Sequence, residues 1–518
     1  MIPSRSRKTW SVIWAARSSP LYRNSKMNAP WATSKPNPFP PGLSFWWLLA
    51  GVFTGLLFLL GMQLNLQWFA FLFLGSLILI ASLAVTDKKD YFLILFVLAL
   101  PVWIGKHLDF QPSPYGISTF GFPIHVSFLP LTALYVIWAV RQVAGEEPAP
   151  LSTRGLLPLA GVFTAAAVSV LGSTDKLFAA FDLFALGTSI LIFIYAASEI
   201  RRRRELRLVL GLLIFSAALQ GAIALAQYLT GSTLGLDFFG AAKKLYGYAG
   251  LEVVSRVGGL IGHPNNLALF FDLMLPLSLS LLFCPMRGRT RFFLAVAVFL
   301  QLAGLSVTFS RGGIIGSGLG VLALAVFHGA RRFGLIRAFF MAMAGAWLLA
   351  AILTVVPNPI EKGLTRTEQT VPGRLRLTGI ALTMIRHHPF FGVGLNNFTH
   401  ASRQYDFTRE QVVSAWNSPV HNLFLFIAGE IGLVGLICFA VFLGQALMAL
   451  IPAMRAPDPF IFSVGGGLFF GLLAFLIHAQ VDYSIWTQNR PLWFFLGLAM
   501  CMWRFGRPAT ATAAPQFP

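Results

Sequence analysis

Long apolar stretches separated by short polar ones run along nearly the whole chain. Each stretch is long enough to cross a bilayer, because about 20 apolar residues in a helix span its hydrocarbon layer. The pattern predicts spans near residues 44–62, 66–85, 91–104, 124–142, 155–173, 178–198, 205–229, 264–284, 291–309, 312–328, 335–356, 421–450, 460–480 and 488–504. The third is short and contains Pro101, which is compatible with a re-entrant segment, and the 421–450 run is long enough to bend. We therefore expect an all-α polytopic membrane protein with about 12–14 membrane helices.

The composition supports a membrane protein and argues against a nucleic-acid-binding one. Of the 518 residues 56% are hydrophobic and 11% charged, whereas soluble domains carry about a quarter charged residues. The net charge of +20 is spread over many short loops and forms no basic domain. Such cations mark the cytoplasmic loops of membrane proteins. Cys284, Cys438 and Cys501 fall in or beside apolar runs, so no disulfide framework is predicted.

The distribution of Lys and Arg predicts the topology and the domain organisation. Basic groups such as Lys88, Lys89 and "RRRRELR" at 201–207 fall on one side of the alternating spans, which predicts that both termini are cytoplasmic. The expected parts are a basic cytoplasmic extension (1–43), a transmembrane bundle (44–356) with an outer loop at about 230–263, an outer loop (357–420), C-terminal spans (421–505) and a cytoplasmic tail (506–518). Met27 is an alternative start of translation.

The outer loop 357–420 contains the pattern of an amphipathic helix. One helical face collects apolar residues at positions Leu377, Ile380, Ala381, Met384 and Ile385. Arg374 and Arg376 begin the stretch, and Pro389 ends it. We expect this helix to lie along the membrane surface.

Motifs for nucleotides and metals are missing from the sequence. There is no "GxxxxGK[ST]" phosphate loop and no Asp-x-Asp or clustered acidic pair on the outer side. The adjacent His387 and His388 point apart on a helix, and nothing nearby completes a metal site. Glycines recur every four residues at Gly312, Gly316 and Gly320, which is typical of close helix packing. We expect neither a cofactor nor a metal.

Four arginines lie at predicted outer membrane boundaries. Arg256 precedes a span, Arg311 sits in a very short connection between two spans, and Arg374 and Arg376 begin the amphipathic helix. A charge in a tight turn at membrane depth is costly unless it is partnered. Such arginines either extend to the lipid headgroups or converge on an anionic ligand. The planar guanidinium suits phosphate because it binds two oxygens at once.

His421 stands where a polar stretch, "NSPVHN", changes into a long apolar one. Ser418 and Pro419 predict the N-cap and first residue of a helix. His421 would then lie near the positive end of the helix dipole and stay neutral. It either caps a helix end or accepts a proton from a hydroxyl. Together with the arginines it suggests group transfer from a donor with an anionic leaving group, such as a diphosphate lipid, to a hydroxyl.

In four ordered pieces the sequence resembles the O-antigen ligase and polymerase superfamily of bacterial membrane glycosyltransferases. The pieces are "SRVGGLIGHPNNLA", "FSRGG", "GRLRLTGIALTMIRHHPFFGVGLNNF" and "HNLFLFIAGEIGLVGL", and they cover roughly residues 250–440. The resemblance implies a GT-C-like fold with a large periplasmic loop, in the bacterial inner membrane. It also implies glycan transfer from undecaprenyl diphosphate without metal or nucleotide.

The family's essential histidine matches His421, and its essential arginines match Arg256 and Arg311. Candidates for substrate binding are Arg374, Arg376, Asn265, Asn396 and Asn422. The expected partners are a lipid-linked saccharide, a hydroxyl acceptor and membrane lipids, with no nucleic acid. The acceptor is lipid A–core sugar in ligases, another lipid-linked chain in polymerases and a protein in O-oligosaccharyltransferases.

Two other classes of protein remain as alternatives. A transporter or flippase would place charges near the bilayer midplane, where Asp182, Asp272 and His478 are the main polar residues. A non-catalytic assembly factor would not need His421 and the arginines on one face. We favour the enzyme, and among enzymes the ligase, with the polymerase next.

Overall fold

The computed structural model describes residues 51, 52, 55, 66–112, 119–145, 152–239, 256–355, 367–409 and 411–507. The chain divides into two units, residues 1–60 and 61–518. The helices, strands and site residues described here belong to the second unit. The predicted extension 1–43, most of the predicted span 44–62, residues 240–255 of the first outer loop and most of the C-terminal tail lie outside the described residues.

The described chain begins with two helices, a small hairpin and a third helix. These elements are α2 (Leu66–Ala84), α3 (Lys88–Ala99), β1 (Gly105–Leu108), β2 (Phe122–His125) and α4 (Phe128–Val143). The strands are antiparallel, with Gly105 opposite His125 and Leu108 opposite Phe122. The predicted third span ends two residues before Pro101, whose ring prevents the helix from continuing.

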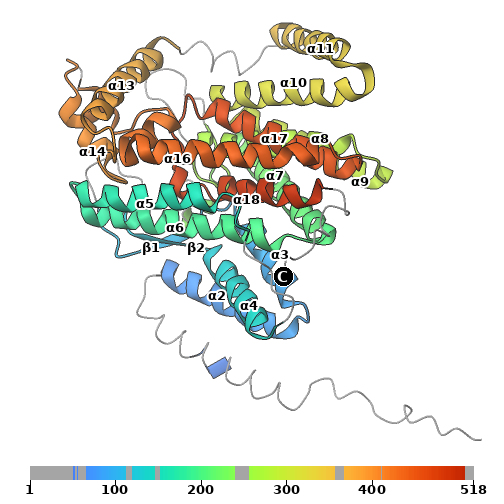
Figure 1. Cartoon of the computed structure of the whole chain (residues 1–518), viewed down its shortest axis with the longest axis horizontal. Coiled ribbons are helices and arrows are strands. Elements are labelled where there is room, and N and C mark those ends of the chain that lie inside the picture. The colour runs from blue at the N-terminus through green and yellow to red at the C-terminus, as the bar shows by residue number, and fades with distance from the viewer. Residues whose placement is uncertain are drawn as a thin grey trace, which may run out of the picture. The chain divides into compact units, whose positions relative to one another are not determined.

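A bundle of long helices follows. Its members are α5 (Leu156–Gly172), α6 (Lys176–Glu199), α7 (Arg203–Thr230), α8 (Pro264–Leu282), α9 (Gly288–Val307), α10 (Arg311–Phe333), α11 (Leu335–Val355), α16 (Leu423–Met454), α17 (Pro459–His478) and α18 (Arg490–Phe505). Helix α8 packs against α17 and α10, α7 against α9, and α16 against α5 and α18 (Figure 1). Helices α8 and α17 are the most buried of the candidate membrane spans.

Seven described helices (α6, α7, α8, α9, α10, α16 and α17) are long and apolar enough to cross a membrane. Shorter apolar helices form parts of α2, α4, α5 and α11. This count covers only the described residues, which leave out most of the predicted span 44–62, and α3, α4, α5 and α18 are each shorter than 18 residues. The prediction of a mostly helical polytopic membrane protein is confirmed, with the β1–β2 hairpin as an exception.

The described part of the predicted outer loop 357–420 includes the α-helices α13 (Thr367–His387), α14 (Phe398–Ser402) and α15 (Val412–Trp416). Helix α13 begins seven residues before Arg374, earlier than predicted. The five predicted apolar residues of α13 are all buried. They are covered by protein, since Leu377 and Ile380 pack with Val412 and Val413 of α15, and Ala381 and Met384 join the main core. The loop therefore folds back over this apolar face, and the placement of the helix along the membrane surface stays a prediction.

Helix α16 is broken at Gly432, which has a φ of 73° that favours glycine. The break leaves backbone groups available, and the chain after α13 bonds to them. Val393 and Gly394 donate to the carbonyls of Gly429 and Glu430, each at 2.9 Å, and Leu433 N donates to the Pro389 carbonyl at 2.7 Å. The bend predicted for this long run is confirmed, and it docks the outer loop onto the bundle.

Candidate functional site

The loop between α17 and α18, residues 479–489, joins the helices that carry the predicted site residues. Its contacts connect Arg374 Nη1 to the Val481 carbonyl at 3.1 Å, Asn422 Nδ2 to the Gln480 carbonyl at 3.1 Å and Asn265 Nδ2 to Asp482 Oδ2 at 2.5 Å. Helices α13, α16 and α8 therefore meet at one end of the bundle. We call this end the site end.

His421 lies in the chain just before α16 and packs against the same loop. Its ring meets the ring of Tyr483 edge-on, with centroids 5.6 Å apart. Its Nδ1 atom is buried and receives no hydrogen bond from any described residue. The imidazole is thus packed against Tyr483, and no hydrogen bond within the described residues occupies its Nδ1 atom.

The predicted start of this helix was wrong by several residues. Asn422, not Ser418, is the N-cap, and its side-chain oxygen accepts hydrogen bonds from Phe424 N and Leu425 N at 3.0 Å. Asparagine is among the best N-cap residues, and Leu423 N bonds to the Ala479 carbonyl at 2.9 Å. His421 consequently precedes the helix instead of lying in its first turn.

The neutral state predicted for His421 is supported, but for a different reason. Burial, together with the nearby Arg374 and His263, lowers the pKa of His421, Asp482 opposes them, and the resulting pKa is about 4. Below its unfolded pKa of about 6.5, protonation therefore opposes folding. The ring stays neutral until the pH approaches 4.

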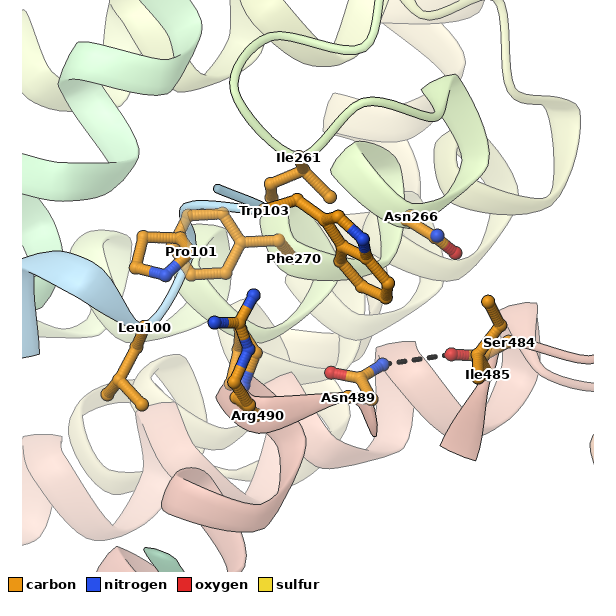
Figure 2. A pocket seen from close by; sticks show the side chains of 11 residues that line it. Leu100, Pro101, Trp103, Ile261, Asn266, Phe270, Ser484, Ile485, Asn489 and Arg490 are labelled. Atoms are coloured by element: carbon orange, nitrogen blue, oxygen red, sulfur yellow. Dashed lines mark hydrogen bonds between the residues drawn. The ribbon is translucent and has the colours of Figure 1, made fainter. Parts of the chain in front are cut away.

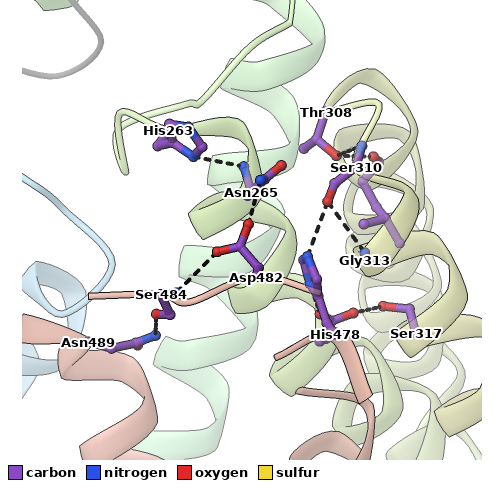
Figure 3. Close-up of polar contacts among 12 residues, drawn as sticks. His263, Asn265, Thr308, Ser310, Gly313, Ser317, His478, Asp482, Ser484 and Asn489 are labelled. Carbon is purple, nitrogen blue, oxygen red and sulfur yellow. Dashed lines mark hydrogen bonds and ion pairs between the residues drawn. The ribbon is translucent and has the colours of Figure 1, made fainter. Parts of the chain in front are cut away.

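Arg256 and Asn265 form a polar chain that ends at Asp482. Figure 3 shows its last link, from Asn265 to Asp482. Arg256 donates from Nη2 to Asn265 Oδ1 at 2.7 Å and from Nε to the Thr308 carbonyl at 2.9 Å. Thr308 belongs to the turn that leads directly into Arg311, the first residue of α10. The two predicted arginines are therefore brought to the same turn.

Asp482 was not predicted, although its contacts place it at the centre of the site. It is 5% exposed. Burial raises its pKa, but His478, His421, an N–H bond from Ser484 and His263 lower it, and the net pKa lies below the usual value. Asp482 is thus ionised beside the candidate base. The one indication of a functional Asp482 in the sequence is its position directly after an apolar span.

His263 is a second residue that the sequence analysis missed. It caps α8, with Nδ1 accepting from Asn265 N at 3.2 Å. Burial and the neighbouring Arg256 lower its pKa, while Asp482 raises it. It stands inside the quoted motif "GHPNN", where proline at the first helical position marks the preceding residue as a cap.

The two arginines of α13 differ in position. Arg374 is half-buried and contacts Val481 in the α17–α18 loop. Arg376 is exposed two residues further along α13, where it faces another side of the helix. The structure therefore joins Arg374 to the site, whereas Arg376 is exposed on α13.

The other two predicted substrate-binding asparagines, Asn422 and Asn396, also have structural contacts. Asn422 is occupied as the α16 cap and as the donor to Gln480. Asn396 is buried, with Nδ2 donating to the carbonyls of Thr119 at 2.8 Å and Phe178 at 3.2 Å, and its backbone N bonds to Glu430 Oε1 at 2.8 Å. The contacts of Asn396 join the loop 357–420 to α6, α16 and the chain before β2.

A small pocket lies beside the α17–α18 loop (Figure 2). Ser484, Asn489 and Arg490 line it together with Asn266 and Trp103. Its volume is about 20 Å³, which is enough for roughly one water molecule. A lipid or a sugar would need a more open arrangement than this pocket provides.

Within the described ranges, no group of three or more His, Cys, Asp or Glu side chains is arranged to hold a metal ion. Metal independence remains a prediction.

The fold and the site define a multi-pass helical membrane protein with a histidine, an ionised carboxylate and several arginines at one end of its bundle. Residues 296–440 match the family model described as O-antigen ligase. The match supports the resemblance to the O-antigen ligase and polymerase superfamily that was inferred from the sequence. It includes His421, Arg311 and Arg374, whereas Arg256 and Asp482 lie outside it.

One solved structure similar to this chain is described as "Structural coordination of polymerization and crosslinking by a peptidoglycan synthase complex". The similarity has a TM-score of 0.38 at 15% identity and covers 68% of this chain and 96% of the other. At that level it supports no argument about this chain. A search of curated proteins finds no match.

Proposed function

We propose that the protein transfers a glycan from a lipid diphosphate, of the undecaprenyl type, to an acceptor hydroxyl at the periplasmic face of the bacterial inner membrane. The observation that carries the proposal is the meeting of His421, Asp482, Arg374, Arg256 and the start of α10 around one loop. Lone arginines that only reached for lipid headgroups would not need to converge.

In the proposed reaction, the acceptor oxygen attacks the anomeric carbon as the bond from that carbon to the diphosphate breaks. His421 takes the hydroxyl proton, and Asp482 stabilises the imidazolium that forms. Arg256, Arg311 and Arg374 bind the diphosphate and take up the charge that grows on it as it leaves.

The low pKa of the free His421 makes it a weak base until the donor binds. Arg374 is one cause of that low pKa. A bound diphosphate would offset the positive charge of Arg374 and add negative charge nearby, so the pKa of His421 would rise. Donor binding would thereby activate the base only when a substrate is present.

Among acceptors we propose lipid A–core sugar, which makes the protein a ligase. The test is deletion in the native host, followed by electrophoresis of the surface polysaccharide. Long chains that accumulate unattached to lipid A support the ligase. Products with a single repeat would assign a polymerase, and an unchanged profile with an altered glycoprotein would assign a protein acceptor.

The proposal also requires the site end to face outward. In a background without Cys284, Cys438 and Cys501, His387→Cys on α13 should react with an impermeant thiol reagent added to spheroplasts, and Arg202→Cys should not. The reverse labelling would contradict both the orientation and a periplasmic reaction.

A further inference from the structure

A buried, hydrogen-bonded pair of an aspartate and a histidine links two membrane helices below the site end. Asp272 of α8 and His478 at the end of α17 lie 2.7 Å apart between Oδ2 and Nδ1, and their side chains are 0% and 1% exposed. A carboxylate inside a membrane bundle is costly, and a buried pair gives little net stability. Its presence therefore suggests a task besides holding α8 to α17.

The pair makes two contacts with the first turns of α10 (Figure 3). His478 Nε2 lies 3.2 Å from Ser310 Oγ, and Ser317 Oγ donates to Asp272 Oδ1 at 2.6 Å. Ser310 is also the N-cap of α10, with Oγ accepting from Gly313 N at 3.4 Å. The Ser310 hydroxyl thus contacts the buried pair and also caps the first turn of α10.

The glycines of α10 make this contact possible. A Cβ at Gly312 would collide with the imidazole ring of His478, and one at Gly316 would lie 2.6 Å from the Ala474 carbonyl. The four-residue glycine spacing, interpreted from the sequence as helix packing, therefore also leaves the space that His478 occupies. Side chains at these positions would push His478 away from Ser310.

We propose that Asp272 and His478 are positioning residues that, through Ser310, fix the orientation of Arg311 toward the donor diphosphate. Arg311 directly follows the cap, so a shift of Ser310 moves the backbone from which the guanidinium extends. Asp272 holds the imidazole, the imidazole holds the Ser310 hydroxyl, and that hydroxyl sets the first turn. The inference rests on the proposed donor-binding function of Arg311.

The test measures donor KM and kcat separately in purified protein with a lipid-diphosphate-linked saccharide. Ser310→Ala should raise donor KM or lower kcat/KM by about 10²-fold, since a misplacement of about 1 Å costs that much. Ser310→Thr retains a hydroxyl and a capping residue, so it should recover most of the activity. Asp272→Asn should give a smaller loss, about 10-fold, because the amide still accepts a weaker hydrogen bond from His478.

Ser278, on the same helix as Asp272, is a matched control. Ser278 of α8 is equally buried, and its hydroxyl accepts from Gln301 Nε2 of α9 at 3.0 Å. Ser278→Ala should leave donor KM unchanged even if it lowers thermal stability. Equal losses in Ser278→Ala and Asp272→Asn would show that the pair only supports the fold, and would overturn the inference.

A double-mutant cycle separates this inference from the proposed function. If Asp272 acts through Arg311, Asp272→Asn should add little to the defect of Arg311→Lys, and the two should be non-additive. Fully additive losses would refute the positioning role while leaving the donor site of Arg311 intact. A wild-type donor KM in Arg311→Lys would instead refute the proposed function of Arg311.

Discussion

The two ends of the helical bundle hold several of their basic residues differently. At the end opposite the site, Lys89 pairs with Glu199 and Glu205 at 3.2 and 3.0 Å. Arg203 pairs there with Asp458, and Arg204 with Asp90, each at 2.6 Å. At the site end, Arg374 donates to a backbone carbonyl, and Arg256 donates to a carbonyl and a side-chain amide.

We propose that the carboxylate-paired cations at the opposite end are structural and that the site-end arginines bind substrate. A carboxylate neutralises its partner, so the paired residues mainly tie loops together. A hydrogen bond to a neutral oxygen orients a guanidinium without cancelling its charge, which suits a group that must receive a diphosphate. The comparison predicts that changes at the site end affect turnover and that changes at the opposite end affect stability.

The largest expected effect at the site end comes from His421→Ala. Turnover should fall about 10²–10⁴-fold, because a positioned base contributes that much, while folding and donor binding persist. His387→Ala, an exposed histidine of the same outer loop, is the control and should remain active. Normal turnover in His421→Ala would reduce this histidine to a packing residue.

The largest expected effect at the opposite end comes from Lys89→Met. It leaves Glu199 and Glu205, which are 6% and 13% exposed, without their cation. Removing one partner of a buried pair costs about 3–5 kcal/mol, so unfolding in detergent should begin at a markedly lower temperature, with normal turnover per folded molecule. Lys88→Met, at the exposed neighbour, should change neither quantity. Lost turnover with unchanged stability in Lys89→Met would contradict the division between the two ends.

Arg256→Lys and Arg311→Lys test the shape of the cation as well as its charge. Lysine keeps the charge and loses the two-pronged contact, and a charge-assisted hydrogen bond contributes about 1.5–3 kcal/mol. Donor KM should therefore rise roughly 10- to 100-fold. Arg203→Lys is the matched change at the opposite end and should leave donor KM unaltered. If the three variants behave alike, the site-end arginines have no special role.

The smallest expected effect is on the pH dependence of kcat/KM, which reports the free enzyme. Because the pKa of His421 is lowered to about 4, kcat/KM should stay level down to about pH 5 and fall near pH 4. Arg374→Gln removes one cause of the lowering, so the acid limb should move to higher pH. An acid limb near pH 6.5 in the wild type would mean that His421 is solvated, and that the burial described here is not the working state.

Much of the fold was predictable because bilayer thickness imposes a length that composition alone reveals. The predicted spans from 66 onward correspond to helices, with ends displaced by several residues where caps decide them, as at Asn422. The apolar face of α13 was also predicted correctly, since helical periodicity is local. The sequence did not predict what covers that face, because α15 packs on it only once the loop has folded back.

By itself, the sequence determined the helical membrane architecture, the ordered family motifs, and His421, Arg256 and Arg311 as candidates. Only the tertiary structure placed Asp482 beside Asn265 and near His421 and His263. Only it brought His478 to Ser310 across 168 residues of chain. Hydropathy and capping act between neighbours in sequence, so they can be inferred from a single chain. An ion pair or a shared hydroxyl between distant helices depends on which faces pack together, and no local pattern specifies that choice.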